Sequence, residues 1–100
     1  YRTAGHEMTE GIRKDIEKAA EVLKEAGARE VYLFGSVAEG RDTPDSDLDF
    51  AVSGIPPSKF FRAVGVAALA IHRQIDVVDL DEPTLFSDYL REKGKLLRVA

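Results

Sequence analysis

Cysteine is absent from this chain, which excludes disulfide bonds and any chemistry that needs a thiolate. Long apolar runs are absent too. No stretch approaches the roughly 20 residues that a membrane-spanning helix requires, and no signal-peptide pattern opens the printed sequence. These absences lead us to expect a cytoplasmic protein that does not enter a membrane.

An excess of positive charge is also missing. The 14 lysines and arginines are outnumbered by 18 aspartates and glutamates, which gives a net charge of −4. The basic residues are scattered among acids, as in residues 13–18, rather than gathered into the stripe that binds a nucleic-acid backbone. Nucleic acid is therefore disfavoured as the main partner. A nucleotide carried with Mg²⁺ is compatible with this charge, because the metal offsets much of the phosphate charge.

What is present suffices for one small folded unit. The chain has 100 residues, of which 44% are hydrophobic and 32% charged, as in soluble globular proteins. A chain of this length buries roughly 60–70% of its unfolded surface, which supports one core. We therefore expect residues 1–100 to form a single domain.

Hydrophobic patterning predicts three strands, at residues 31–34, 47–53 and 75–80. The first is apolar on both faces, so we expect it in the interior of a sheet. Residues 36–39 are expected to form a brief helical turn after the first strand. The tail, residues 96–99, is expected either to add an edge strand or to pack loosely.

Apolar residues at steps of three and four predict the helices. The first runs from about Met8 to Ala26 and is ended by Gly27. The second covers residues 58–73. Pro83 suits the first position of a third helix, with Asp81 or Glu82 near its cap, and Lys93-Gly94 closes it. The residues expected to face the core are Ile12, Ile16, Ala19 and Leu23 in the first helix, Phe60, Phe61, Val64, Ala68 and Ile71 in the second, and Leu85, Phe86, Tyr89 and Leu90 in the third.

The most informative segment runs from Gly35 to Asp49. An apolar run leads into Gly35-Ser36, a polar loop follows, and Asp47 and Asp49 open the next apolar run. Alternate residues of a strand share a face, so these two carboxylates are expected on one side, about 7 Å apart. Unless a cation lies between them, such carboxylates repel each other and raise each other's pKa. Their oxygens suit a divalent metal ion.

Gly-Ser, ten residues and Asp-x-Asp resemble the signature of the DNA polymerase β-like nucleotidyltransferase superfamily. The Gly40-Arg41 pair and a third acidic strand with Asp76 extend the resemblance over nearly the whole chain. The sequence is similar to the minimal nucleotidyltransferases of that superfamily. The resemblance implies an α/β (α+β) fold, in which helices pack against a small mixed sheet.

The resemblance also implies roles for individual residues. Catalysis and the binding of two Mg²⁺ ions are assigned to three aspartates, Asp47, Asp49 and Asp76. Binding of the ATP phosphates is assigned to Gly35, Ser36 and Arg41. Glycine has no Cβ to block a phosphate, and a small hydroxyl at a helix start favours an anion. Asp79 competes with Asp76 as third ligand, since only one of them can share the metal face of the strand. The family motif favours Asp76.

The implied activity is Mg²⁺-dependent transfer of a nucleoside monophosphate, AMP from ATP, to an acceptor hydroxyl. The chain has no room for a second substrate domain, so we expect the acceptor surface to come from another subunit or to be the substrate itself. In the proteins it resembles, the minimal domain neutralises a HEPN-domain toxin by transferring AMP to it, which implies a toxin–antitoxin pair and a hetero-oligomer. Two alternatives stay open. One is a non-catalytic partner that inhibits a HEPN-type protein by contact, and the other is transfer to a small molecule.

Overall fold

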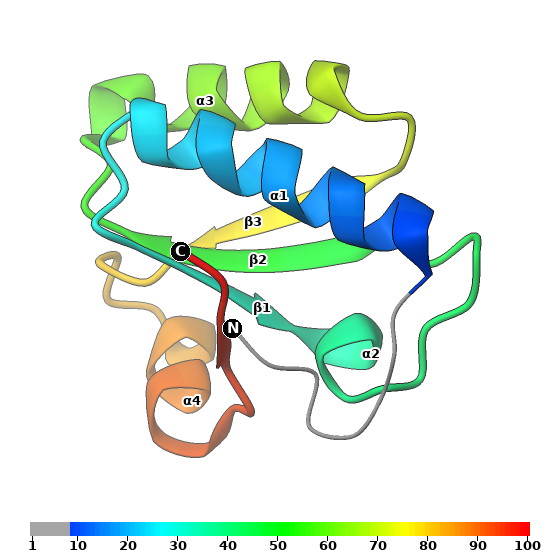
Figure 1. Cartoon of the computed structure of the whole chain (residues 1–100). Coiled ribbons are helices and arrows are strands. Elements are labelled where there is room, and N and C mark those ends of the chain that lie inside the picture. Colours follow the sequence, from blue (N-terminus) through cyan, green and yellow to red (C-terminus); the bar gives the residue numbers. More distant parts are fainter. Residues whose placement is uncertain (1–8) are drawn as a thin grey trace.

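The computed structural model describes residues 9–100, and all structural statements concern these residues. Helices and strands alternate along most of the chain (Figure 1). In order they are α1 (Glu10–Glu25), β1 (Glu30–Phe34), α2 (Gly35–Ala38), β2 (Leu48–Ser53), α3 (Pro57–Ala70), β3 (Ile75–Asp79), α4 (Leu85–Lys93) and β4 (Leu97–Arg98). None of these helices is both long and apolar enough to span a bilayer.

The four strands form one mixed sheet in the order β3-β2-β1-β4. β1 runs antiparallel to β2 and β4, whereas β2 and β3 are parallel. The predictions of a small mixed sheet and of an interior first strand are confirmed, and of the two alternatives for the tail the structure has the edge strand. This topology brings the last residues of β1 and the first residues of β2 and β3 together at one end of the sheet.

α1 and α3 cover one face of the sheet (Figure 1). The predicted stripe of α1 is buried there at Ile12, Ile16, Ala19 and Leu23. The prediction for Met8 lies outside the described residues. From the sheet, Leu48 and Phe50 of β2 and Ile75 of β3 point into the same core. The residues between them, Asp49 and Asp76, therefore point to the opposite face.

α4 lies on that opposite face, whereas α2 follows β1 at the end of the sheet, with Val37 buried in the larger core (Figure 1). A smaller cluster there joins Leu90 of α4 to Ala51 of β2 and Leu80, with Phe34 and Val78 packed against it. This cluster covers only part of the sheet face. The carboxylates of Asp49 and Asp76 share the face with it, at the end of the sheet where β2 and β3 begin.

The predicted second helix was wrong in its end and in one of its core residues. α3 stops at Ala70, because the buried Ile71 adopts an extended backbone (φ −130°, ψ 163°). Small residues, Ala63 and Ala67, form its buried face, which turns Phe61 outward to 83% exposure. Phe60 is only partly buried against the core.

The predicted start of the last helix was also wrong. Thr84, not a residue before Pro83, is the N-cap of α4, and it forms a capping box with Ser87. The helix ends at Lys93 with Gly94 as its cap, as predicted. Of its expected apolar face only Leu90 is buried, whereas three large side chains are exposed, Leu85, Phe86 and Tyr89. These side chains stay exposed because α4 packs on a narrow sheet face, with few neighbouring elements to cover them.

Candidate active site

The corner between β1 and α2 lies against the side chain of Asp49. Gly35 has φ of +77°, a conformation that residues with a Cβ rarely adopt. A Cβ at Gly35 would overlap Oδ2 of Asp49 and lie 3.3 Å from its Cγ. Ser36 follows as a half-buried residue at the start of α2. The Gly-Ser turn and the second aspartate of Asp-x-Asp therefore meet in space, as their chemistry requires.

Asp49 and Asp76 are direct partners in the parallel pairing of β2 with β3. Phe34, the last residue of β1, is the partner of Asp49 on its other side. Asp79 pairs three positions further along, with Val52, and its Oδ1 accepts a hydrogen bond of 2.9 Å from the backbone N–H of Asp81. The structure therefore brings Asp76, and not Asp79, beside Asp49.

Asp47 lies just before β2 instead of inside it, which corrects the predicted start of this strand. Its side chain is exposed, as is that of Asp76, whereas Asp49 is half-buried. Burial raises the pKa of Asp49, and the neighbouring charges of Asp76 and Asp47 raise it further. Asp76 and Asp47 are thus close enough for their charges to act on Asp49.

These carboxylates fit a hard divalent cation in their chemistry, because all their donors are oxygen. Burial is the largest cause of the raised pKa of Asp49, and repulsion from Asp76 and Asp47, which a cation would relieve, adds to it. Their side chains do not converge on a single point in this structure. Within residues 9–100, no three His, Cys, Asp or Glu side chains are gathered tightly enough to hold a metal ion as they stand. Asp47 and Asp76 are both exposed, so their side chains would have to turn toward Asp49 for all three to hold one cation.

Arg41 is at the margin of the site. Its backbone N–H donates to the carbonyl of Ser36 at 2.9 Å, which closes the turn after α2. Its guanidinium points to Glu39, with Nη2 at 3.1 Å from Oε1, in an exposed ion pair. Arg41 is therefore close to Gly35 and Ser36 in the sequence, but its guanidinium forms its ion pair with Glu39 and not with either of them.

Arg73 holds the loop before Asp47, and sequence reasoning missed it. Its Nη1 donates to the carbonyls of Ser46 (2.8 Å) and Pro44 (2.9 Å), and its Nε donates to Oδ2 of Asp15 in α1 (2.9 Å). Its side chain is only 13% exposed. In the sequence it is one more basic residue near a helix end, so no local pattern marks it.

Comparison with known proteins agrees with this geometry. Residues 17–99 match the family model described as "Polymerase beta, Nucleotidyltransferase". No curated protein matches the chain. Among solved structures, a chain from "Crystal structure of the toxin-antitoxin with AMP-PNP" has 26% sequence identity and a TM-score of 0.62, with coverage of 80% of this chain and 69% of that one.

Proposed function

The chain belongs to the polymerase beta nucleotidyltransferase family, and from this premise we propose that it transfers AMP from ATP to a hydroxyl of a protein acceptor. The pairing of Asp49 with Asp76, directly beside the Gly35-Ser36 corner, carries the proposal. It places a glycine corner, where no Cβ stands between the backbone and the Asp49 carboxylate, beside the carboxylates that a nucleotide–metal complex needs.

Mg²⁺ is the metal that this site would take, held by Asp47, Asp49 and Asp76. When bound, Mg²⁺ neutralises phosphate charge and stabilises the attacking and leaving oxygens. The raised pKa of Asp49 supports this assignment, because a cation would relieve the repulsion that causes part of the shift.

The chain's own residues would bind and orient the two substrates. Gly35 lets the backbone come close to the phosphates, and the Ser36 hydroxyl donates to a terminal phosphate oxygen. Arg41 adds a positive charge if its exposed pair with Glu39 opens. Asp76, the more exposed partner of Asp49, accepts the proton of the acceptor hydroxyl. That oxygen then bonds to the α-phosphorus, the bond to the bridging oxygen breaks, and pyrophosphate leaves.

The acceptor we propose is a toxin of the HEPN type, with this chain as its antitoxin in the cytoplasm. The structural neighbour at 26% identity is described as a toxin-antitoxin with AMP-PNP, which supports both a nucleotide and a protein partner. The HEPN identity of the toxin rests on the sequence resemblance.

Calorimetric titration with Mg²⁺ and AMP-PNP tests the nucleotide site. We expect Asp76→Asn to weaken binding at least about tenfold, which is 1.4 kcal/mol, because it removes a carboxylate beside Asp49. Asp79→Asn is the matched control on the same strand and is expected to bind within about twofold of wild type. The reverse order would show that the wrong aspartate has been assigned.

Inhibition of the toxin by contact alone is the second candidate. It is favoured by one observation, that the carboxylates of residues 9–100 do not form a ready metal cluster. It predicts that the triple variant Asp47→Asn/Asp49→Asn/Asp76→Asn neutralises a co-expressed toxin as well as wild type does. Loss of neutralisation in a folded triple variant would reject it.

A further inference from the structure

β3 is the outer strand of the sheet and, within the described residues, pairs only with β2. The carbonyl of Gln74 accepts from Leu48 at 3.0 Å, and the N–H of Leu80 donates to Val52 at 2.8 Å. Backbone groups of a strand alternate between its two edges, so Val77, at an odd position between them, directs its N–H and C=O to the open edge. An unpaired edge of this kind is a template for another strand.

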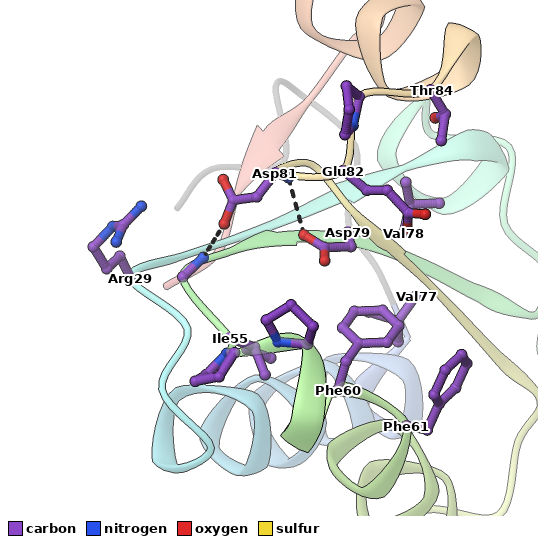
Figure 2. A pocket seen from close by; sticks show the side chains of 14 residues that line it. Arg29, Ile55, Phe60, Phe61, Val77, Val78, Asp79, Asp81, Glu82 and Thr84 are labelled. Carbon is purple, nitrogen blue, oxygen red and sulfur yellow. Dashed lines mark hydrogen bonds between the residues drawn. The ribbon is translucent and has the colours of Figure 1, made fainter.

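A groove of about 850 Å³ follows the same edge. Phe60 and Phe61 of α3 form one wall, with their rings 5.7 Å apart at 82°. Thr84 lies across from them, and Val77 contributes from β3 (Figure 2). Because Phe61 is 83% exposed, a large aromatic surface is available here to a ligand.

Hydrogen bonds fix the end of the groove before any ligand binds. Oδ2 of Asp81 accepts from the N–H of Gly54 at 2.7 Å, which ties the loop after β3 to the loop after β2 (Figure 2). The guanidinium of Arg91 donates twice to the carbonyl of Leu80, at 2.9 and 3.1 Å. A groove held in this way lowers the ordering cost of binding.

Charge selects the occupant. Three carboxylates line the groove, Asp79, Asp81 and Glu82, and Arg29 is the one cation among its lining residues. Asp81 is already paired with Arg91 at 3.5 Å, whereas the Glu82 carboxylate has no hydrogen bond or ion pair within residues 9–100. A second copy of the chain fits poorly, since pairing two β3 strands would bring together four carboxylates, Asp76 and Asp79 from each. A segment with lysine or arginine next to its apolar residues complements the groove.

We propose that the β3 edge binds an extended, basic and apolar segment of a protein partner, which adds as a strand to the sheet. Main-chain hydrogen bonds form at Val77, an apolar side chain packs on Phe61, and a lysine or arginine meets Glu82. Asp76 lies on the same strand, so the segment would pass the carboxylate that we assign to the acceptor proton. This last consequence rests on the proposed function, whereas the docking does not.

A random display library of 12-residue peptides is the probe, selected against the full chain. We expect enriched peptides to alternate apolar residues with lysine or arginine, and to shift the NMR amide signal of Val77. Phe61→Ser and Glu82→Lys are each expected to weaken the selected peptides at least about tenfold. Leu69→Ser is the matched control, because Leu69 is 87% exposed on the same helix but does not line the groove.

Val77→Pro tests the strand pairing separately. It removes the outward N–H without touching the bonds to β2, a position where sheets accept proline, and it is expected to abolish peptide binding in a protein whose circular dichroism is unchanged. No enrichment, enrichment of acidic peptides, or equal binding by Phe61→Ser would overturn the proposal. Sedimentation as a dimer that Val77→Pro dissociates would also overturn it, in favour of a second copy. None of these readouts involves ATP, so nucleotidyl transfer stands or falls independently.

Discussion

The contact between Gly35 and Asp49 is the residue-scale feature on which the site depends. Gly35→Ala is expected to lower the free energy of unfolding by about 1–2 kcal/mol, because alanine, unlike glycine, is strained at a left-handed φ. The new Cβ also overlaps Oδ2 of Asp49, so nucleotide binding should fall as well. Urea denaturation and calorimetry measure the two effects.

Gly65→Ala is the control for that substitution. A Cβ there meets nothing within 4 Å, and the residue lies inside α3. We expect this variant to gain roughly 0.5–1 kcal/mol of stability from the higher helix propensity of alanine, with nucleotide binding unchanged. A Gly35→Ala variant as stable and as active as Gly65→Ala would contradict the close contact.

Asp49→Asn is expected to raise the melting temperature at pH 7. The folded state raises the pKa of Asp49, so it binds the proton more tightly than the unfolded chain does. Wild type therefore loses stability as pH rises from the ordinary value of 3.8 through the raised folded pKa. The amide carries no such penalty. The gain should be full above the folded pKa and disappear below pH 3.8.

Thermal melts of the two proteins across this pH range are the measurement. Mg²⁺ provides an internal check, because it should raise the melting temperature of wild type at pH 7 more than that of Asp49→Asn. A variant that is less stable than wild type at neutral pH would show that Asp49 is stabilised by its surroundings instead of repelled.

At the scale of elements, Arg73 joins α1 to the loop before β2. Arg73→Ala is expected to cost about 2–3 kcal/mol, because three charge-assisted hydrogen bonds of a mostly buried side chain are lost. Freed from these bonds, the loop between Arg41 and Asp47 should be cut faster by trypsin after Arg41. Timed digestion followed by mass spectrometry measures this rate.

Arg62→Ala supplies the comparison, since Arg62 is an exposed arginine of α3 whose side chain forms no hydrogen bond or ion pair within residues 9–100. It should leave both stability and the cleavage rate near wild type. Equal cleavage rates in the Arg73 and Arg62 variants would show that the loop is held by something other than Arg73.

The sequence predicts strands here better than it predicts helix faces. Short apolar runs placed β1, β2 and β3 within one or two residues, because a buried strand tolerates few polar residues. The same reasoning put Phe61 in the core, although α3 packs through alanines. Helical spacing shows that a face is apolar but not how much of it a small protein can cover.

Some residues of the candidate site could likewise be predicted from the sequence, and others could not. Asp49, Asp76 and Gly35 could be predicted because motif spacing and strand pairing bring them together. The contacts of Arg73 with Asp15 and with the Ser46 carbonyl span 58 and 27 positions. Such long-range contacts leave no local pattern in the sequence.

The whole molecule has a site at one end of the sheet and an open strand edge beside it. Both the carboxylates and the groove involve β3, through Asp76 and Val77. Exposed apolar side chains of α3 and α4 add to the surface available to a partner. This arrangement suits an enzyme whose acceptor is a protein, because an extended partner can cover β3 and the site together.

The most direct test of this account follows the α-phosphate of ATP. The protein is incubated with α-labelled ATP, Mg²⁺ and an extract from its source organism, with Asp49→Asn and the exposed surface variant Asp88→Asn as comparisons. We expect wild type and Asp88→Asn to label a protein band, and Asp49→Asn to lose at least about a hundredfold of that labelling. A labelled small molecule, label retained by Asp49→Asn, or no label from folded wild-type protein would contradict transfer to a protein acceptor.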